Sequence, residues 1–430
     1  MGIMIGAARS ATIVGAGQGG LHLAYGLMAS GWKVRLIADR TPSQYMNLGA
    51  LSGHMLQQRS IAKERAAGID LYDSLINNSA CGVDFALSAN GVDIDMHFQG
   101  DFEAPAIAVD TRLKCSRALE TFIRRQGNVV YHSASVRDLE EWAEQDDAVF
   151  VATGRGALSG LFELDEARTV YEKPQRELLL LIVRGIQAPR EENVGRIKFC
   201  FNPEHGELFY GPQVHFTNTP VHQVLVEARP GGAMDRFAGI SDGEQALKVA
   251  QSLFVDFAGW EADNVSGMRL ADPKAWLRGA VRPLVRKPVA TLPSGRPVFG
   301  IGDVLMVLDP AAGQGGNAAA WGIDDLLKGL RELDGPVVRR DWYEDRFEQF
   351  WEREGRHFST FSNMLIEPPN EAIQTLFGAS LRSRAVADRL VSTFAHPKVL
   401  MSYIDSVESA ERFAREAEQG VRLQPPLSSS

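Results

Sequence analysis

A glycine-rich segment near the N-terminus has the residue types and spacing that bind a nucleotide diphosphate. It contains Gly15, Gly17 and Gly20, follows the apolar run Ala11–Val14 and precedes a helical apolar pattern over Leu21–Ser30. The first two glycines let the backbone turn tightly and approach a diphosphate, and the third allows the helix to pack closely on the strand. Amides at the start of the helix then face the phosphates. The segment predicts adenine-dinucleotide binding, with a purely structural turn as the alternative.

An acidic residue that binds a ribose is expected about 20 residues after the glycines of such a loop. The segment Trp32–Ile37 alternates as a second strand and leads into Asp39 and Arg40. Asp39 lies at a suitable distance, one position past the usual end of the strand. Either Asp39 reaches the ribose hydroxyls or Arg40 contacts a phosphate or the adenine. A solvated pair of loop residues is the alternative without a binding role.

A second glycine-rich segment follows another buried strand, which begins at Val298 and ends in Gly302-Asp303. A carboxylate at the end of a strand can accept hydrogen bonds from a sugar or polyol close to a diphosphate. The loop that follows would direct backbone donors at the edge of a flavin ring. Its sequence is Asp309-Pro310-Ala-Ala-Gly313-Gln314-Gly315-Gly316-Asn317. Together with the first segment, this loop predicts a flavin site.

The two segments resemble the glutathione-reductase-type FAD fold of flavoprotein monooxygenases. More narrowly, the chain is similar to the oxygenase component of two-component styrene and indole monooxygenases, the styrene monooxygenase A type, from the first strand to about residue 410. The strings that carry this resemblance are Ala38-Asp39-Arg40-x-Pro42, Ala104-Pro105, Val109-Asp110-x-Arg112, Ala152-Thr153-Gly154, Glu172-Lys-Pro-Gln-Arg176, His205-Gly-Glu-Leu208, Gly302-Asp303 and Asp309-Pro310-x-x-Gly313-Gln314-Gly315-x-Asn317. The Lys-Pro-Gln-Arg and His-Gly-Glu-Leu strings are particular to this branch.

The resemblance implies an enzyme that uses FADH2 and O2, through a flavin C4a-peroxide or hydroperoxide, to epoxidise indole or styrene-like vinyl aromatics. The cofactor supplies the oxidant, and the protein supplies placement and a dry site. The residues expected to hold FAD are Gly15, Gly17, Gly20, Asp39, Arg40, Arg112, Gly154, Asp303, Pro310, Gly313, Gln314, Gly315 and Asn317.

The strand that ends in Ala152-Thr153-Gly154 bears on the source of reducing power. It lacks the acid that single-component aromatic hydroxylases carry there, and the spacing of Gly156 and Gly160 does not suit a second dinucleotide site. We therefore expect a separate NADH-dependent flavin reductase to deliver FADH2, by transient contact or by diffusion. A single-component NAD(P)H-dependent FAD aromatic hydroxylase is the alternative. A flavin-dependent halogenase is disfavoured because the sequence contains no Trp-x-Trp-x-x-Pro string.

The segment Leu48–Leu56 corresponds to the loop that the family places between flavin and substrate. Styrene-type members carry Arg-Leu-Leu-Asn there, whereas this chain has Gly-Ala-Leu-Ser ending at Ser52, which resembles the indole-active branch. The resemblance implies substrate contacts from Leu51, Ser52 and Leu56.

Two side chains of this loop are candidate catalytic residues. Ser52 could accept a hydrogen bond from an indole N–H or bind a water near the peroxide, or it could simply stabilise a turn. His54 is a candidate proton donor to the peroxide, with a packed core histidine as the alternative.

Composition limits the classes of partner. The 430 residues carry a net charge of −9, which disfavours nucleic-acid binding. Three cysteines are too few for a disulfide framework or a cysteine metal site, so we expect no metal and a cytoplasmic location. No apolar run approaches the roughly 18 residues of a membrane span. A homodimer is left open.

The expected fold class is α/β, with an FAD-binding Rossmann fold, an interleaved antiparallel-sheet substrate domain and a helical C-terminal region. We assign residues 1–44, 105–170 and 281–340 to the first part, 45–104 and 171–280 to the second, and 341–430 to the third. A short strand is expected over Ile107–Arg112, and the stretch from 45 to about 100 is expected to be rich in turns.

Overall fold

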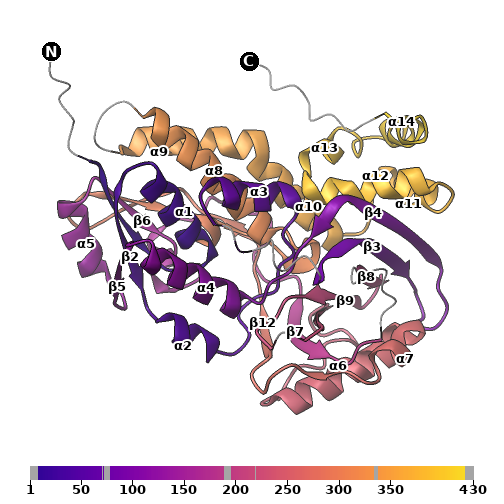
Figure 1. Cartoon of the computed structure of the whole chain (residues 1–430). Helices are drawn as coiled ribbons and strands as arrows, with labels where there is room; N and C mark the ends of the chain where they lie inside the picture. The colour runs from indigo at the N-terminus through magenta and orange to yellow at the C-terminus, as the bar shows by residue number, and fades with distance from the viewer. Residues whose placement is uncertain are drawn as a thin grey trace.

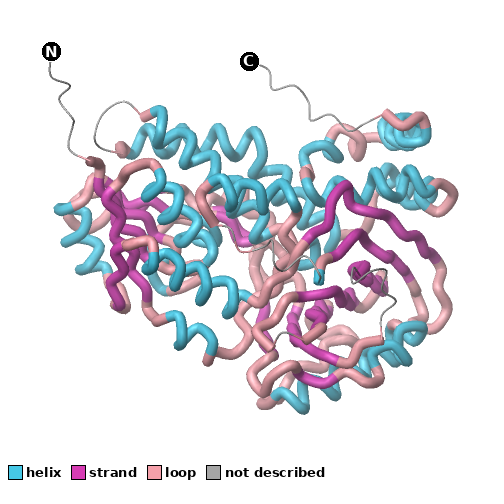
Figure 2. Tube along the Cα trace, in the orientation of Figure 1, coloured by secondary structure: helices cyan, strands magenta, loops and turns pink. Residues whose placement is uncertain are grey.

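The computed structural model describes residues 8–69, 71, 78–187, 195–217, 219–333 and 338–421. The described chain forms two sheets and a group of C-terminal helices (Figures 1 and 2). The outermost residues of the predicted parts, 1–7 and 422–430, lie outside this description. The exact division into domains stays a prediction.

The first sheet has the strand order β14-β15-β6-β1-β2-β5 and is parallel except for its edge pair β14–β15. Its strands are β1 (Ser10–Val14), β2 (Lys33–Ala38), β5 (Asn128–Tyr131), β6 (Ala148–Val151), β14 (Val289–Thr291) and β15 (Pro297–Gly300). Four of these strands match runs that the sequence predicts. The central strands are buried on both faces, which explains their continuous apolar sequence.

Helices cover both faces of this sheet because alternate residues of each strand point to opposite sides. Ala11 and Ile13 of β1 pack with α1, α4 and α8, whereas Val14 belongs to the cluster formed with α5. These helices span α1 (Gln18–Ala29), α4 (Thr111–Arg124), α5 (Val136–Gln145) and α8 (Gly315–Glu332). The Tyr25 O–H donates to the carbonyl of Ala118 at 2.8 Å and joins α1 to α4.

The second sheet has the order β11-β7-β10-β9-β8-β3-β4, with β12 also paired to β7. Its strands are β3 (Ala80–Leu87), β4 (Met96–Ala106), β7 (Glu177–Arg184), β8 (Gly195–Asn202), β9 (Gly206–Gln213), β10 (Val221–Ala228), β11 (Arg269–Leu270) and β12 (Trp276–Ala280). The pair β3–β8 is parallel, so the sheet is mixed and the expectation of a wholly antiparallel sheet is corrected.

One face of the second sheet is covered by α6 (Gly243–Phe257) and the other by C-terminal helices. The remaining helices are α2 (Pro42–Met46), α3 (Gln58–Ala66), α7 (Ala262–Val265), α9 (Arg340–Phe350), α10 (Arg356–Ile366), α11 (Glu371–Ser380), α12 (Arg384–Ser392), α13 (Lys398–Met401) and α14 (Val407–Glu418). A short ladder pairs β13 (Leu284–Val285) with β16 (Met306–Val307). In Figure 1, α11 and α12 lie beside β3 and β4.

Two local expectations are wrong. The stretch from 45 to about 100 is expected to be rich in turns, but from Ala80 onward the chain forms a long hairpin of β3 and β4. Glycine is typical of turns, but Gly100 lies within β4. A Cβ there would lie 2.4 Å from the Ala387 carbonyl oxygen of α12, so this glycine allows the helix to approach the strand closely. The expected strand Ile107–Arg112 is reduced to isolated bridges at Ile107 and Val109. Asp110 instead caps α4 by accepting from the Arg112 amide.

No helix in the described ranges is long and apolar enough to cross a membrane. Within the same ranges, no group of three or more His, Cys, Asp or Glu side chains could hold a metal ion.

Candidate functional site

A cavity of about 700 Å³ lies between the carboxyl ends of the parallel strands and the loops of the second sheet. Its volume falls within the range of ligand pockets. The predicted residues that line it are Gly15, Gly17, Asp39, Arg40, Leu51, Ser52, His54, Gly154, Asp303, Pro310, Gly313 and Gly315. The structure therefore brings both glycine-rich segments and the predicted loop to one cavity.

The three fingerprint glycines meet different demands. Gly15 has φ 114°, and a Cβ there would lie 2.5 Å from the Ala152 carbonyl oxygen. A Cβ on Gly20 would lie 1.9 Å from the Gly15 oxygen, so Gly20 allows the close packing of α1 and does not line the cavity. Gly17 faces open space, and no side chain caps α1 there. This end of α1 fits a diphosphate.

Asp39 and Arg40 both line the cavity and bind each other, with Arg40 Nη2 2.6 Å from Asp39 Oδ2. The Arg40 guanidinium lies 5.8 Å from the centre of the Tyr45 ring. The Tyr45 O–H donates to the Ala16 carbonyl at 3.0 Å, within the glycine loop. The pair therefore lies beside the place for a diphosphate, and either side chain can contact the ribose or adenine part.

On the opposite wall, Asp303 follows β15 and its side chain is exposed to the cavity. Desolvation by the surrounding protein raises the pKa of its carboxyl, and Arg155 opposes that shift. Thr153 Oγ1 is buried and has no hydrogen-bond partner among the described residues. Such polar groups fit the hydroxyl-rich chain between a diphosphate and a flavin ring.

The loop before α8 turns at Gly313, with φ 62°, and is held from below by Asn317. Asn317 Oδ1 accepts from the Gln57 amide at 3.0 Å, and Nδ2 donates to the carbonyls of Met55 at 2.9 Å and Gly313 at 3.0 Å. Gln314 Nε2 donates to the Phe394 carbonyl at 3.1 Å. Gln314 and Asn317 lie outside the lining of the cavity and hold the loop in place; that they bind the cofactor stays a prediction.

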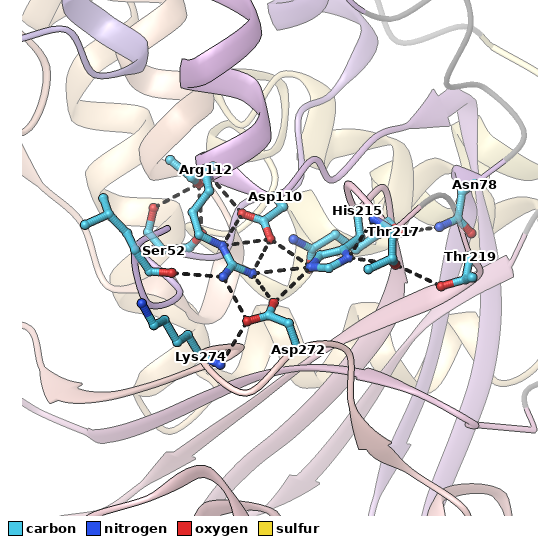
Figure 3. A network of polar contacts seen from close by, with 12 residues as sticks. Ser52, Asn78, Asp110, Arg112, His215, Thr217, Thr219, Asp272 and Lys274 are labelled. Atoms are coloured by element: carbon cyan, nitrogen blue, oxygen red, sulfur yellow. Dashed lines mark hydrogen bonds and ion pairs between the residues drawn. The ribbon is translucent and has the colours of Figure 1, made fainter. Parts of the chain in front are cut away.

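Arg112 was expected to bind the cofactor, but its guanidinium is fully buried among protein partners (Figure 3). Its Nη2 lies 2.7 Å from Asp110 Oδ2 and 2.8 Å from Asp272 Oδ2. Its Nη1 donates to the Leu48 carbonyl at 3.1 Å. Burial raises the pKa of Asp272, but hydrogen bonds from His215 and Arg112 outweigh burial and lower it below its ordinary value. Arg112 is not among the residues that line the cavity, and cofactor binding by Arg112 stays a prediction.

The contacts of Arg112 fix the loop that carries the candidate catalytic residues. The Leu48 carbonyl binds Arg112, the Ala50 amide donates to the Lys274 carbonyl at 2.8 Å, and Thr111 Oγ1 donates to the Ser52 carbonyl at 3.0 Å. The Ser52 side chain is exposed to the large cavity and lies 3.5 Å from Thr111 Oγ1. Loop 48–54 is therefore anchored to the start of α4 and to the segment before β12.

A second, smaller cavity of about 60 Å³ adjoins the large one. The residues that line both are Gly53, His54, Pro310 and Gly313. The other walls of the small cavity are mostly apolar and come from the second sheet, at Leu180, Ile197, Phe199, Phe209 and Leu225. The predicted substrate contacts Leu51, Ser52 and Leu56 do not line it. Leu56 is buried in a separate core cluster.

His54 lies at the junction of the two cavities. It is buried, and its Nε2 has no partner in the described part of the chain. Burial, reinforced by the nearby Lys114 charge, lowers the pKa of His54 to about 3. The imidazole is therefore neutral at neutral pH and can donate or accept one hydrogen bond, but it is not a cationic acid.

Gln223 is a lining residue that the sequence argument missed. Its Oε1 is buried, faces the small cavity and has no partner within the described ranges. A Cβ on Gly53 would lie 2.8 Å from this oxygen, so Gly53 leaves the Gln223 side chain room in its present position. The sequence did contain a signal for this residue. Val221, Gln223 and Leu225 lie on one face of β10, and a polar residue between two apolar ones on that face indicates a specific polar role.

Known proteins place this geometry in context. Residues 154–264 match the model of the styrene monooxygenase A putative substrate binding domain. Over 407 residues the chain is 28% identical to styrene monooxygenase StyA of a Pseudomonas species, covering 90% of this chain and 92% of that relative. StyA of Pseudomonas fluorescens is 28% identical over 410 residues, with the same coverage.

Two solved structures share the fold. The flavin-dependent brominase Bmp2 has a TM-score of 0.62 at 12% identity, covering 97% of this chain and 100% of that chain. A tetrameric 2-methyl-3-hydroxypyridine-5-carboxylic acid oxygenase has a TM-score of 0.55 at 16% identity, covering 98% and 100%. The predicted α/β fold of FAD-dependent monooxygenases is thereby confirmed.

Proposed function

We propose that this chain, which is similar to styrene monooxygenase StyA over 90% of its length, is an FAD-dependent monooxygenase of the styrene monooxygenase A family and the oxygenase component of a two-component system. It receives reduced FAD from a separate NADH-dependent flavin reductase and epoxidises a small vinyl aromatic or indole. The observation that carries the proposal is the pair of adjoining cavities, one large and bordered by both glycine-rich segments and by Asp39, Arg40 and Asp303, the other small and apolar.

In this proposal the large cavity holds FAD. Gly15, Gly17 and the start of α1 bind the diphosphate, Asp39 or Arg40 the adenosine part, and Asp303 the polyol chain. Gly154 and the loop Pro310–Gly315 flank the remaining length. Bound in its reduced form, FAD supplies the chemistry that activates O2 and transfers one oxygen atom.

The protein supplies a dry and shaped site. The apolar side chains of the small cavity exclude water from the reacting groups, which suppresses side reactions. His54 bridges both cavities, and its neutral imidazole offers one N–H or one lone pair without adding charge to an apolar site. Ser52 and Leu51 face only the large cavity, so we assign them to the cofactor side.

Gln223 favours indole as the substrate. Its unpartnered Oε1 in the small cavity is an acceptor suited to an aromatic N–H, which styrene lacks. A buried acceptor left without a donor costs about 1–3 kcal/mol. The site therefore pairs more completely with indole, and a vinyl aromatic is the second candidate.

The test combines the purified chain with FAD, NADH, an NADH-dependent flavin reductase, and either indole or styrene. We expect oxygenated product from indole only when both proteins are present. Product formation with NADH or NADPH and no reductase would instead support a single-component hydroxylase. If neither indole nor styrene gave an oxygenated product, the proposal would be contradicted.

The role of Gln223 is tested by two substitutions in the same assay. Gln223→Leu keeps the size of the side chain and removes the acceptor, and we expect kcat/KM for indole to fall about tenfold or more while that for styrene holds or rises. Gln223→Glu keeps an acceptor and serves as the matched control. An equal loss for both substrates would contradict selection by Gln223.

A further inference from the structure

A third cavity, of about 270 Å³, lies between the second sheet and the C-terminal helices α10, α11 and α12. We call it the side chamber. Aromatic rings form one wall: Phe85 stacks on Phe98 at 4.9 Å between ring centres and lies 5.1 Å from Phe377. In Figure 1 it corresponds to the region where α11 and α12 face β3 and β4.

The polar groups of the side chamber are largely occupied by protein partners. Glu207 accepts two hydrogen bonds from Arg176, at 2.7 and 2.8 Å. Asn202 donates to the carbonyls of Ser88 and Ala89. Arg229 also lines the side chamber, and its buried Nε has no partner among the described residues. Most of the other lining side chains are apolar or aromatic, which suits an aromatic ring better than a sugar-like molecule.

Two rings separate the side chamber from the small cavity. Phe199 and Phe394 line both cavities. Their ring centres lie 5.8 Å apart, and the edge of one ring points at the face of the other. Phe394 belongs to a short turn of helix, Thr393–Ala395, and is only half-buried. The Gln314 amide holds its carbonyl, so the backbone at this partition is tied to the loop beside the cofactor site.

Volume decides what each cavity can hold. An apolar protein cavity of about 150 Å³ is large enough for benzene. With Phe394 in its present position the small cavity has about 60 Å³, so a ring can enter it only if this wall moves, whereas the side chamber at about 270 Å³ already has room for a ring with a short side chain. Protein interiors are otherwise close-packed, so a chamber of this size requires an explanation.

We propose that the side chamber is a binding site for the small aromatic substrate, indole or a vinyl aromatic, on its way to the small cavity, and that rotation of the Phe394 side chain admits it. This inference rests on the proposed function, since the occupant is the substrate of that site. The exposed Glu367 and the neighbouring Pro369 mark the solvent side of the side chamber.

Crystals of the full chain soaked in 4-bromostyrene test the site directly. We expect anomalous bromine density in the side chamber of the native protein and none there in Met364→Trp, because an indole ring on this half-buried wall residue fills the space. Leu381→Trp, on an exposed position outside the lining, is the matched control and should keep the density. Bromine only in the small cavity, or nowhere, would overturn the inference.

Kinetics with the reductase test whether the side chamber lies on the route. Met364→Trp should raise KM for styrene about tenfold and leave kcat unchanged, and Leu365→Phe is a second, milder filling variant with the same expected direction. Unchanged KM in both would overturn the route. Failure of the proposed function would appear as native enzyme that forms no product, and the bromine density still reports on the site in that case.

Discussion

Asn317 Oδ1 accepts a hydrogen bond from the Gln57 amide at 3.0 Å across 260 positions of sequence. The same side chain donates to the Met55 and Gly313 carbonyls, so one buried amide joins the loop that carries His54 to the turn at Gly313. The two segments that border both cavities are thus held as one unit. Any account of the site depends on this connection.

Replacing Asn317 should separate the two loops. Asn317→Asp keeps the acceptor for the Gln57 amide and loses both donors, and Asn317→Ala loses all three contacts. We expect unfolding free energy to fall by about 1–3 kcal/mol in Asn317→Ala, and by more in Asn317→Asp because a buried carboxylate would face the Met55 and Gly313 carbonyl oxygens. Product formed per reduced FAD consumed should fall in the same order. Urea unfolding and product quantification check both, and full yield in Asn317→Ala would contradict the assigned role.

Arg112 should matter for folding more than for direct cofactor contact. Arg112→Met leaves the Asp110 and Asp272 carboxylates without their shared partner, and we expect a loss of about 3–5 kcal/mol in unfolding free energy. Arg356→Met removes an exposed pair with Glu352 and should cost under about 1 kcal/mol. Equal thermal stability of these two variants would show that the buried network contributes little.

His54 should make stability depend on pH. Its pKa is lowered from 6.5 to about 3 by burial, so the unfolded chain binds the proton more readily. Above pH 6.5 the His54 side chain is neutral in both states and does not reduce the free energy of unfolding. As pH falls from 6.5 toward 3, the unfolded chain takes up the proton and the free energy of unfolding falls by about 1.4 kcal/mol per pH unit. Burial lowers the pKa of His22 in the same direction, so His54→Gln should remove only part of the slope.

Chemical denaturation at pH 7 and pH 5 measures this slope. Ser52→Ala, on the same loop and without a titrating group in this range, is the control and should keep the full slope. A slope in His54→Gln equal to that of the native chain would show that His54 already carries a proton or does not lose it on folding.

Phe394 should control the size of the substrate. Phe394→Ala removes the ring between the small cavity and the side chamber and joins their volumes. We expect kcat/KM for 2-vinylnaphthalene to rise about tenfold relative to styrene. Competition between the two substrates measures the ratio, and a ratio that stays at the native value would contradict the partition.

Sequence patterns predicted the central strands of the first sheet well because each of them is a short apolar run followed by a glycine-rich segment, a turn or a helix, whereas the edge strand β14 was not predicted. The glycine loop, Asp303 and the turn at Gly313 were placed on one cavity for the same reason. The hairpin of β3 and β4 was missed because Gly100, which suggests a turn, lies within β4. There it allows α12 to approach the strand closely. Such contacts depend on tertiary packing and leave no local pattern.

The finer assignments at the site could not follow from spacing alone. Arg112 lies in a motif near the cofactor loops, but its partner Asp272 is 160 positions away and holds it off the cavity. Ser52 and Gly53 are neighbours, yet only Gly53 lines the small cavity. Gln223 comes from a strand whose neighbours in the sheet are set by long-range register.

The most direct test of the central claim is a single turnover without any nicotinamide. FAD reduced chemically under anaerobic conditions is mixed with the purified chain, and O2 and indole are then added. The account predicts close to one oxygenated product per bound FADH2, with no reductase and no NADH present. No product under these conditions, but product when NADH or NADPH is supplied directly to the chain, would contradict it.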